Sequence, residues 1–233
     1  MNAEKKDAKQ RMGAGNKAYA GIKELLFSYA IKPGEKVAEA DIAVRFGISR
    51  TPVREALNRL VMEELLEFVP EQGFYRPAIN EQEIFDLYEL RVILEAEALR
   101  LSTHRASDEE IEQLISEWEG RVSERTRMDG TMTRAQLIEE DETLHERVAA
   151  LSHNMQIVSA LRRVNARIHF IRWAPTSDDV EHSKGYENHL QFLRVLRLRD
   201  ETRSVAALRG IIERRREDLL NILKEGVAQL YIR

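Results

Sequence analysis

One carboxylate and two imidazoles lie on the apolar faces of segments with helical spacing. Asp141 and His145 are four residues apart, so on a helix they are neighbours on one face. That face also carries Leu137, Leu144, Val148 and Leu151. His189 lies in a similar stripe with Tyr186, Leu190, Leu193 and Leu196. A carboxylate with two imidazoles suits Zn²⁺, Ni²⁺ or Mn²⁺, so we predict a divalent-metal site formed by Asp141, His145 and His189 inside a helical bundle.

Other polar side chains share these inward-facing positions and are candidates for binding an anion. Arg91 falls on an apolar face with Leu87, Leu94 and Ala98. Because an unpaired buried charge is strongly unfavourable, these inward-facing groups must satisfy one another, a metal or a ligand. The alternative for Arg91 is a pair with Glu95 or Glu97 at the surface, if the helix is rotated. We expect a small carboxylate effector to contact Arg91, Asn165, His189 and Arg215. The alternative is that the aspartate and the histidines form a hydrogen-bonded polar core that binds no metal.

The composition restricts the class of protein that can carry this site. The 233 residues include only 11 Gly and 5 Pro, too few for a turn-rich β-sandwich. The absence of cysteine excludes disulfides and thiolate metal sites and fits a cytoplasmic location. No apolar run approaches the ~18–20 residues of a membrane-spanning helix, so we expect no membrane partner. The formal net charge is -4, so any nucleic-acid binding must rest on a local arrangement of basic residues.

The second part of the chain, residues 79–233, has the pattern of long amphipathic helices. We place them at about 81–103, 107–127, 134–151, 154–173, 181–199 and 201–226. Ser107 and Glu110 have the spacing of a capping box at the start of the second of these helices. Six helices with short connections favour a six-helix antiparallel bundle, which we expect to bind an effector and to form a dimer.

The first part has shorter elements separated by turn residues. Helical spacing covers 17–29 and 39–46, and Gly47 suits the left-handed residue that ends a helix. A third helix runs from Ser49, a candidate N-cap, to about Glu64, with Pro52 in its first turn. Residues 65–70 and 73–78 form a predicted β-hairpin. This order indicates a mainly α protein whose residues 17–78 form a winged helix-turn-helix, preceded by a flexible arm at residues 1–16.

Basic residues gather at the start of the third helix, where a helix-turn-helix contacts DNA. The second helix of such a motif lies in the major groove, and its first residues meet base edges and phosphates. The hairpin tip can reach the adjacent minor groove, where glycine permits a close approach of the backbone. The acid Glu55 is the one opposing charge from the helix start to Arg59. The predicted DNA contacts are Ser49, Arg50, Thr51, Arg54, Arg59, Gln72 and Gly73. The alternative is that these arginines form only a solvated helix face.

These residues resemble a known family. The segment Phe46–Leu57, with Pro33-Gly34 before it and Gly73-Phe74 after it, resembles the GntR family of bacterial transcription regulators. The helical part is similar to the FCD effector domain of the FadR branch, and its six helices resemble the VanR-type subgroup. The matching motifs in this part are Leu90-Arg91-x-x-Leu94-Glu95, Asp141-x-x-x-His145 and Asn188-His189. The resemblance implies that Arg50 and Arg54 contact DNA and that Gly73 lies at the tip of the wing.

The resemblance also implies a metal held by one aspartate and three histidines. Asp141, His145 and His189 match the first three positions, but Ile211 stands where the third histidine is expected. Ile211 cannot bind a metal, so three ligands would leave positions for water or for an effector carboxylate.

Together these patterns predict a ligand-responsive bacterial transcription regulator. We expect a repressor that binds a palindromic operator as a homodimer, because a two-fold DNA site matches a two-fold protein. A small carboxylate, assisted by a divalent metal, would bind in the helical domain and control the operator affinity. One alternative is a metal-dependent enzyme built on Asp141, His145 and His189, although no general base accompanies them. Another is a DNA-binding protein that responds to no effector.

Overall fold

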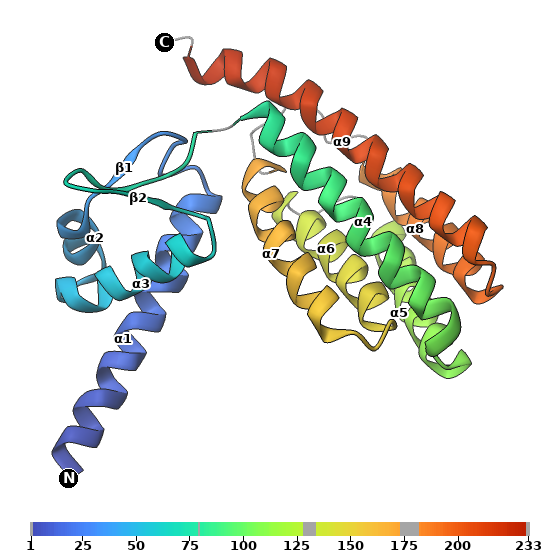
Figure 1. The fold of residues 1–233 in the computed structure, drawn as a ribbon, viewed down its shortest axis with the longest axis horizontal. Coiled ribbons are helices and arrows are strands. Elements are labelled where there is room, and N and C mark those ends of the chain that lie inside the picture. The colour runs from blue at the N-terminus through green and yellow to red at the C-terminus, as the bar shows by residue number, and fades with distance from the viewer. Residues whose placement is uncertain (1, 79, 128–133, 173–181, 232–233) are drawn as a thin grey trace. The chain divides into compact units, whose positions relative to one another are not determined.

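The computed structural model describes residues 2–78, 80–127, 134–172 and 182–231, which fall into two compact units, Met1–Asn80 and Glu81–Arg233. The helices and strands of the first unit, seen in Figure 1, are α1 (Asn2–Phe27), β1 (Lys36–Val37), α2 (Glu39–Phe46), α3 (Arg50–Met62), β2 (Glu67–Val69) and β3 (Gly73–Tyr75). The three strands form one antiparallel sheet in the order β1-β3-β2. This unit is a winged helix-turn-helix, as the sequence predicts.

Turn residues set the ends of α2 and α3. Gly47 has a φ of 65°, and its N–H donates to the carbonyl groups at the end of α2. Ser49 occupies the N-cap position of α3 with extended backbone angles, and Pro52 lies in the first turn, where no donor is needed. Among the described residues the Ser49 hydroxyl makes no capping hydrogen bond, so it stays exposed. The chain therefore turns sharply between α2 and α3 while the start of α3 remains accessible.

The core of the first unit joins α1, α3 and the sheet. Its largest fully buried apolar side chains are Ile22, Leu26, Leu57, Leu60 and Phe74. Gly21 permits α1 to approach Phe46 closely, because a Cβ atom at Gly21 would lie 2.6 Å from the Phe46 ring. This packing fixes α1 against the helix-turn-helix.

The beginning of the chain differs from the prediction, because α1 starts at Asn2 rather than at Lys17. The prediction placed a flexible arm at residues 1–16, since this segment has no apolar stripe. An apolar stripe is a sign of packing, however, and not a condition for a helix. The segment has three Ala and three Lys, residues of high helix propensity, and it continues the helix that packs in the core.

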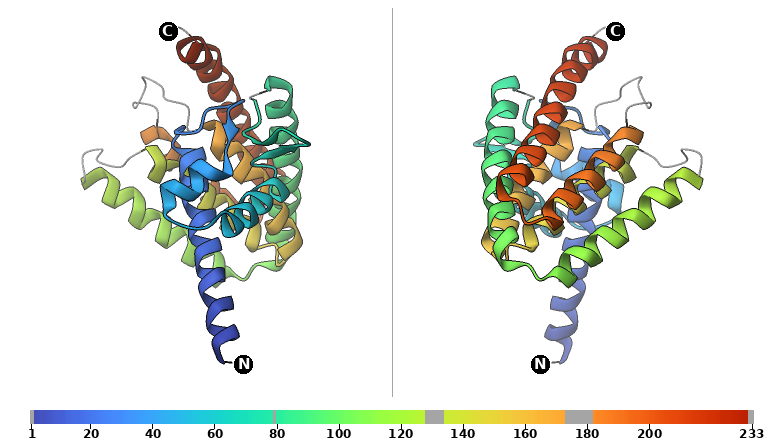
Figure 2. Two further views of the ribbon diagram at one scale, coloured as in Figure 1. Left: turned by 90° about the vertical axis from the view of Figure 1, so that its left-hand side faces the viewer. Right: turned by 90° about the vertical axis from the view of Figure 1, so that its right-hand side faces the viewer.

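The second unit is a bundle of long helices. Within its described residues these are α4 (Glu81–Arg105), α5 (Asp108–Arg127), α6 (Arg134–Ala150), α7 (Met155–Arg172), α8 (His182–Arg197) and α9 (Glu201–Tyr231). The six predicted helices are thus confirmed, with most ends within two residues of the expected positions. Helix α4 packs against α6, α7 and α9, while α8 packs against α5 and α9. Figures 1 and 2 show α4 and α9 side by side along the bundle. No helix in the described part of the chain is long and apolar enough to cross a membrane.

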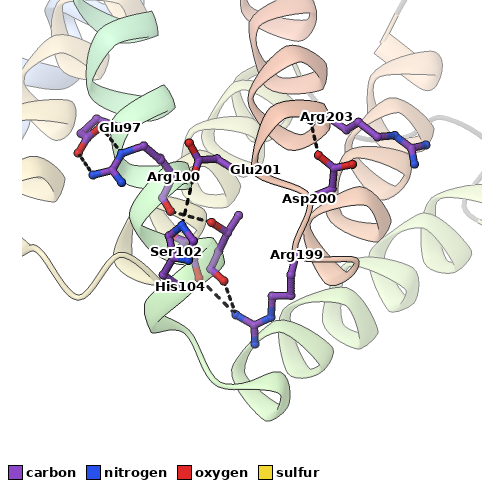
Figure 3. A network of polar contacts seen from close by, with 9 residues as sticks. Glu97, Arg100, Ser102, His104, Arg199, Asp200, Glu201 and Arg203 are labelled. Atoms are coloured by element: carbon purple, nitrogen blue, oxygen red, sulfur yellow. Dashed lines mark hydrogen bonds and ion pairs between the residues drawn. The ribbon is translucent and has the colours of Figure 1, made fainter.

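Polar contacts fasten the helix ends of this unit. Ser107 and Glu110 form the predicted capping box at the start of α5, with reciprocal bonds of 3.2 and 2.7 Å. Figure 3 shows Arg199, in the turn between α8 and α9, donating to the carbonyl oxygen of Ser102 near the end of α4. The same guanidinium pairs with Asp108 at 2.6 Å. Arg199 therefore links the α8–α9 turn to the end of α4 and to the start of α5.

Candidate metal centre and nucleic-acid interface

The structure brings Asp141, His145 and His189 together in the interior of the second unit. Asp141 and His145 lie one turn apart on α6, and His189 lies on α8. Their side chains are no more than 5% exposed. The Nε2 atoms of the two histidines are 3.3 Å apart, and Asp141 Oδ1 lies 3.4 Å from Nε2 of His189 and 4.0 Å from Nε2 of His145. The three predicted ligands therefore face one another.

This geometry fits a single divalent ion. Donor atoms separated by 3.3, 3.4 and 4.0 Å can all lie ~2.0–2.2 Å from one common point, which is the range of zinc–nitrogen and zinc–oxygen bonds. Within the described residues, the same three side chains form a group of potential ligands with all donor atoms inside 4.8 Å. Two imidazoles and one carboxylate suit zinc and the neighbouring transition metals better than calcium or magnesium.

The electrostatic surroundings keep His189 neutral at neutral pH. Burial lowers the pKa of His189 to about 3; Asp141 opposes this shift, whereas the electrostatic interactions with His145, Arg215 and Arg91 add to it. Neutral imidazole is the form that binds a metal. The contribution of Arg215 also shows that the guanidinium on α9 lies within electrostatic range of the centre.

Aromatic side chains pack beside the ring of His189. Trp118 of α5 meets the His189 ring edge to face at 5.6 Å and stacks on Tyr186 at 5.1 Å. Its indole N–H donates to the Tyr186 carbonyl at 3.1 Å. These contacts fix the ring of His189 and limit the access of water from the α5 side.

Glu95 of α4 is a site residue that the sequence analysis considered only as a partner of Arg91. Its side chain is 3% exposed; Oε1 accepts a hydrogen bond from Arg91 Nε at 2.5 Å, and Oε2 contacts His145 Nδ1. Burial by itself raises the pKa of Glu95, but the charge of Arg91, together with His145 and the hydrogen bonds from both, lowers it to about 2. The carboxylate is therefore ionised and joins α4 to the metal ligands on α6.

The predicted effector-binding residues have different surroundings. Arg91, which is 1% exposed, forms an ion pair with Glu95, and this pair is buried rather than at the surface as the alternative in the sequence analysis had it. Asn165 is 2% exposed and donates weakly to Glu146 at 3.5 Å, while its Oδ1 atom has no hydrogen-bond partner among the described residues. Arg215 is partly exposed. Ile211, one turn before Arg215 on α9, is buried as predicted.

In the first unit, the start of α3 is exposed as expected for a helix that reads DNA. Arg50, Thr51 and Arg54 are exposed, and the opposite face, with Val53, is buried. The Arg54 guanidinium lies 3.6 Å from a carboxylate oxygen of Glu39 on α2 and keeps 63% of its side chain exposed. The arginine is therefore oriented by α2 without being withdrawn from solvent.

Arg59, also predicted to contact DNA, is directed toward α1. Its guanidinium donates to Asn16 at 3.0 Å and lies 4.1 Å from the centre of the Tyr19 ring. Tyr19 in turn donates to Glu63 at the end of α3 at 2.6 Å. Arg59 thus connects α3 to α1. This contact could not be predicted from the sequence, because it depends on how the two helices pack.

The hairpin between β2 and β3 has the expected glycine at its tip and a basic neighbour that sequence reasoning missed. Gln72 is exposed, and Gly73 has a φ of 100°. A Cβ atom at Gly73 would lie 3.8 Å from the side chain of Lys36. Lys36 lies on β1, which pairs with β3 in the sheet. The two-residue strand β1 could not be predicted from the sequence. In the sheet Lys36 pairs with Tyr75, and its side chain extends toward Gly73 at the wing tip.

Comparison with known proteins identifies the family of both units. Residues 14–75 match the bacterial regulatory proteins of the gntR family, and residues 86–214 match the FCD domain. The chain is 34% identical over 210 residues to the Nta operon transcriptional regulator of Aminobacter aminovorans, covering 88% of this chain and 94% of that protein. The chain belongs to the GntR family. It is a bacterial transcription regulator with an FCD effector-binding domain.

Other GntR-family regulators have the same architecture. An HTH-type transcriptional regulator of Bacillus subtilis, YdhC, is 27% identical over 89% of this chain and 92% of its own length. The solved structure of E. coli McbR/YncC superposes with a TM-score of 0.73 at 22% identity, covering 89% of this chain and 97% of that chain. A GntR structure from Rhodococcus sp. RHA1 gives a TM-score of 0.69. Because the relatives are named as transcriptional regulators, the enzyme alternative does not apply to this GntR-family chain.

Proposed function

We propose that this GntR-family regulator is a repressor that binds a palindromic operator as a homodimer and responds to a small carboxylate. The carboxylate would bind in the FCD domain beside a divalent metal held by Asp141, His145 and His189. The observation that carries this proposal is the buried triangle of donor atoms from these three side chains, with edges of 3.3, 3.4 and 4.0 Å. The assignment to the VanR-type subgroup remains a prediction from the six-helix pattern.

Charge balance in the interior favours an anion as the effector. Glu95 and Arg91 neutralise each other, and His189 is neutral because of its low pKa. Asp141 contributes one negative charge, so a divalent ion would leave the centre positive. Arg215 adds further positive potential from α9. A buried excess charge is unfavourable, and an anionic ligand would compensate it.

The residues of the chain have separate roles in this proposal. A bound divalent ion would supply positive charge and open coordination positions for a carboxylate oxygen. Arg215 would attract and orient the carboxylate, and the amide oxygen of Asn165 would accept a hydrogen bond from a hydroxyl group on the ligand. Ile211 contributes an apolar surface on α9 where a further ligand would otherwise stand.

The DNA-binding part of the proposal rests on the exposed start of α3. Arg50 and Arg54 would read base edges or bind phosphates in the major groove, with Ser49 and Thr51 on the backbone. Gln72 and Gly73 would reach the adjacent minor groove. One such unit contacts few base pairs, so two copies related by two-fold symmetry would provide sufficient affinity and specificity.

The effector controls operator affinity only if it binds the DNA-competent and the released states differently. A difference of ~1–3 kcal/mol is usual for coupled sites and corresponds to about 5–150-fold in affinity. For a repressor, the carboxylate would favour the released state. Metal and effector would therefore weaken operator binding together more than either does alone.

The test is operator binding by fluorescence anisotropy with a panel of organic, sugar and fatty acids, each with and without Zn²⁺ or Ni²⁺. The operator is first selected in vitro with the full-length protein, and the salt concentration is held constant. We expect one carboxylate to weaken binding in the presence of metal, and the same acid to raise the melting temperature of the native protein. The Asp141→Ala variant should bind the operator but lose the response.

Two results would contradict the proposal. If no acid changes operator affinity or melting temperature with or without metal, the chain is a DNA-binding protein that responds to no carboxylate. If Asp141→Ala responds to the acid as the wild type does, the effector binds elsewhere.

A further inference from the structure

We infer that Glu95, held by Arg91, is a positioning residue that presents Nε2 of His145 to the metal. This inference rests on the metal centre of the proposed function and assigns to α4 a role that the three ligands on α6 and α8 do not reveal. It also makes Arg91 a part of the metal centre's support rather than a contact of the effector.

The first step is the contact between Glu95 and the far side of the His145 ring. Oε2 of Glu95 meets Nδ1 of His145, while Nε2 of the same ring points at Asp141 and His189. An ionised carboxylate can only accept a hydrogen bond, so Nδ1 must be the nitrogen that carries the proton. In neutral His145 the lone pair then lies on Nε2, on the side where the other two donor atoms are.

The second step is the ion pair with Arg91 that fixes the Glu95 carboxylate. Arg91 is one turn before Glu95 on α4, and its Nε donates to Oε1 at 2.5 Å. The two carboxylate oxygens therefore serve two different partners, Arg91 on one side and His145 on the other. All three side chains are at most 3% exposed, so water does not compete for these bonds.

The consequence is a chain of contacts from α4 to the metal position on α6. Carboxylates that bind the second nitrogen of a metal-ligating histidine fix its tautomer and orientation, and their loss typically weakens metal binding 10–100-fold. Because Arg91 is committed to Glu95, the effector's carboxylate would rely on Arg215 for its cationic partner. Arg91 would influence the effector only through the geometry of the centre.

The experiment compares Glu95→Gln with the matched control Glu97→Gln in the full-length protein. Glu97 lies on the same helix and also pairs with an arginine, Arg100 at 2.7 Å, but both partners are exposed and do not contact the centre. The affinity for Zn²⁺ is measured by competition with a chelator. In metal-free protein, long-range ¹H–¹⁵N spectra of labelled histidine report which ring nitrogen of His145 carries the proton, with the signals assigned by a His145→Gln variant.

The expected result is that wild-type His145 is protonated on Nδ1 and that Glu95→Gln loses this preference, because an amide can both donate and accept. Zn²⁺ binding should weaken about 10–100-fold in Glu95→Gln and remain unchanged in Glu97→Gln. Wild-type His145 with its proton on Nε2, or Glu95→Gln with unchanged Zn²⁺ affinity, would overturn the inference.

Two other outcomes can also be interpreted: a wild type that binds no Zn²⁺, and a Glu95→Gln variant that does not fold. If the wild type binds no Zn²⁺, the metal part of the proposed function fails, but the tautomer of His145 still decides the role of Glu95. If Glu95→Gln does not fold because Arg91 is left without its carboxylate, the double variant Arg91→Met with Glu95→Gln removes both charges. It should give the same tautomer change and the same weakening of Zn²⁺ binding, and a wild-type result in both measurements would overturn the inference.

Discussion

Replacement of Arg91 by methionine should destabilise the FCD domain strongly, although the two side chains have similar length. Arg91 and Glu95 are 1% and 3% exposed, and the atoms that pair are 2.5 Å apart. Methionine retains most of the buried apolar volume of the arginine stem but leaves the Glu95 carboxylate in the interior without its cation. The loss is therefore expected to come from charge and not from a cavity.

Two arguments give the same magnitude for this loss. The pKa of Glu95 is about 2 instead of 4.5, a net difference of ~3 kcal/mol in favour of the ionised form, to which Arg91 makes the largest favourable contribution and His145 the next. Removal of one partner from a buried ion pair costs about 3–5 kcal/mol in proteins. For comparison, the pair of Arg100 and Glu97, with 42% and 49% of the side chains accessible, should contribute little because solvent screens both charges. The Arg100→Met variant is thus the matched control.

The assay is urea unfolding of the wild type, Arg91→Met, Glu95→Gln and the double variant, from which a double-mutant cycle gives the coupling energy. The pH dependence provides a second reading. Because the folded pKa of Glu95 lies below 4.5, its contribution to stability is complete above about pH 4.5 and is lost as the pH falls toward about 2. In Arg91→Met the pKa of Glu95 rises, so this acid-side loss of stability should become smaller.

The reasoning would be refuted if Arg91→Met lowered the free energy of unfolding by no more than Arg100→Met does. A coupling energy near zero in the cycle would likewise show that the pair of Arg91 and Glu95 is solvated. Either result would also remove the support for a fixed His145.

Further predictions concern both domains. Arg54→Ala should weaken operator binding by ~1–3 kcal/mol, measured by fluorescence anisotropy at fixed salt. Arg59→Ala should bind the operator with nearly wild-type affinity, because Arg59 contacts α1. Equal losses of affinity in the two variants would contradict the placement of α3. Lys36→Ala should lower the salt slope of operator binding by ~1 for all operator sequences, and an unchanged slope would exclude a phosphate contact at the wing. Ile211→His should tighten Zn²⁺ binding in chelator competition by adding a fourth ligand; unchanged affinity would mean that this residue does not face the centre.

The helices of the second unit were predictable because the signals that define them are local. Apolar spacing, the scarcity of glycine and proline, and the capping box of Ser107 and Glu110 mark helix starts and ends without knowledge of the neighbours. The same spacing places Asp141, His145 and His189 on inner faces. It does not say which inner faces meet, so their approach to within 4.8 Å is information from the fold.

Glu95 and Lys36 show why the remainder could not be predicted. Helix α4 packs against three helices, α6, α7 and α9, so periodicity does not identify which of them a side chain such as Glu95 meets. Lys36 is part of a two-residue strand whose existence depends on pairing with β3, far along the chain. Arg59 is exposed, and its prediction as a DNA contact stays a prediction, but its contacts with Asn16 and the Tyr19 ring of α1 could not be read from the sequence.

The most direct test of the central claim is X-ray absorption at the zinc edge of protein loaded with one equivalent of Zn²⁺. The account predicts stoichiometric binding with scattering from two imidazoles and from oxygen ligands at ~2.0–2.1 Å, and loss of the imidazole signal in His145→Ala with His189→Ala. Zinc bound without imidazole ligands, or an unchanged spectrum in the double variant, would contradict the assignment of the metal to the buried centre.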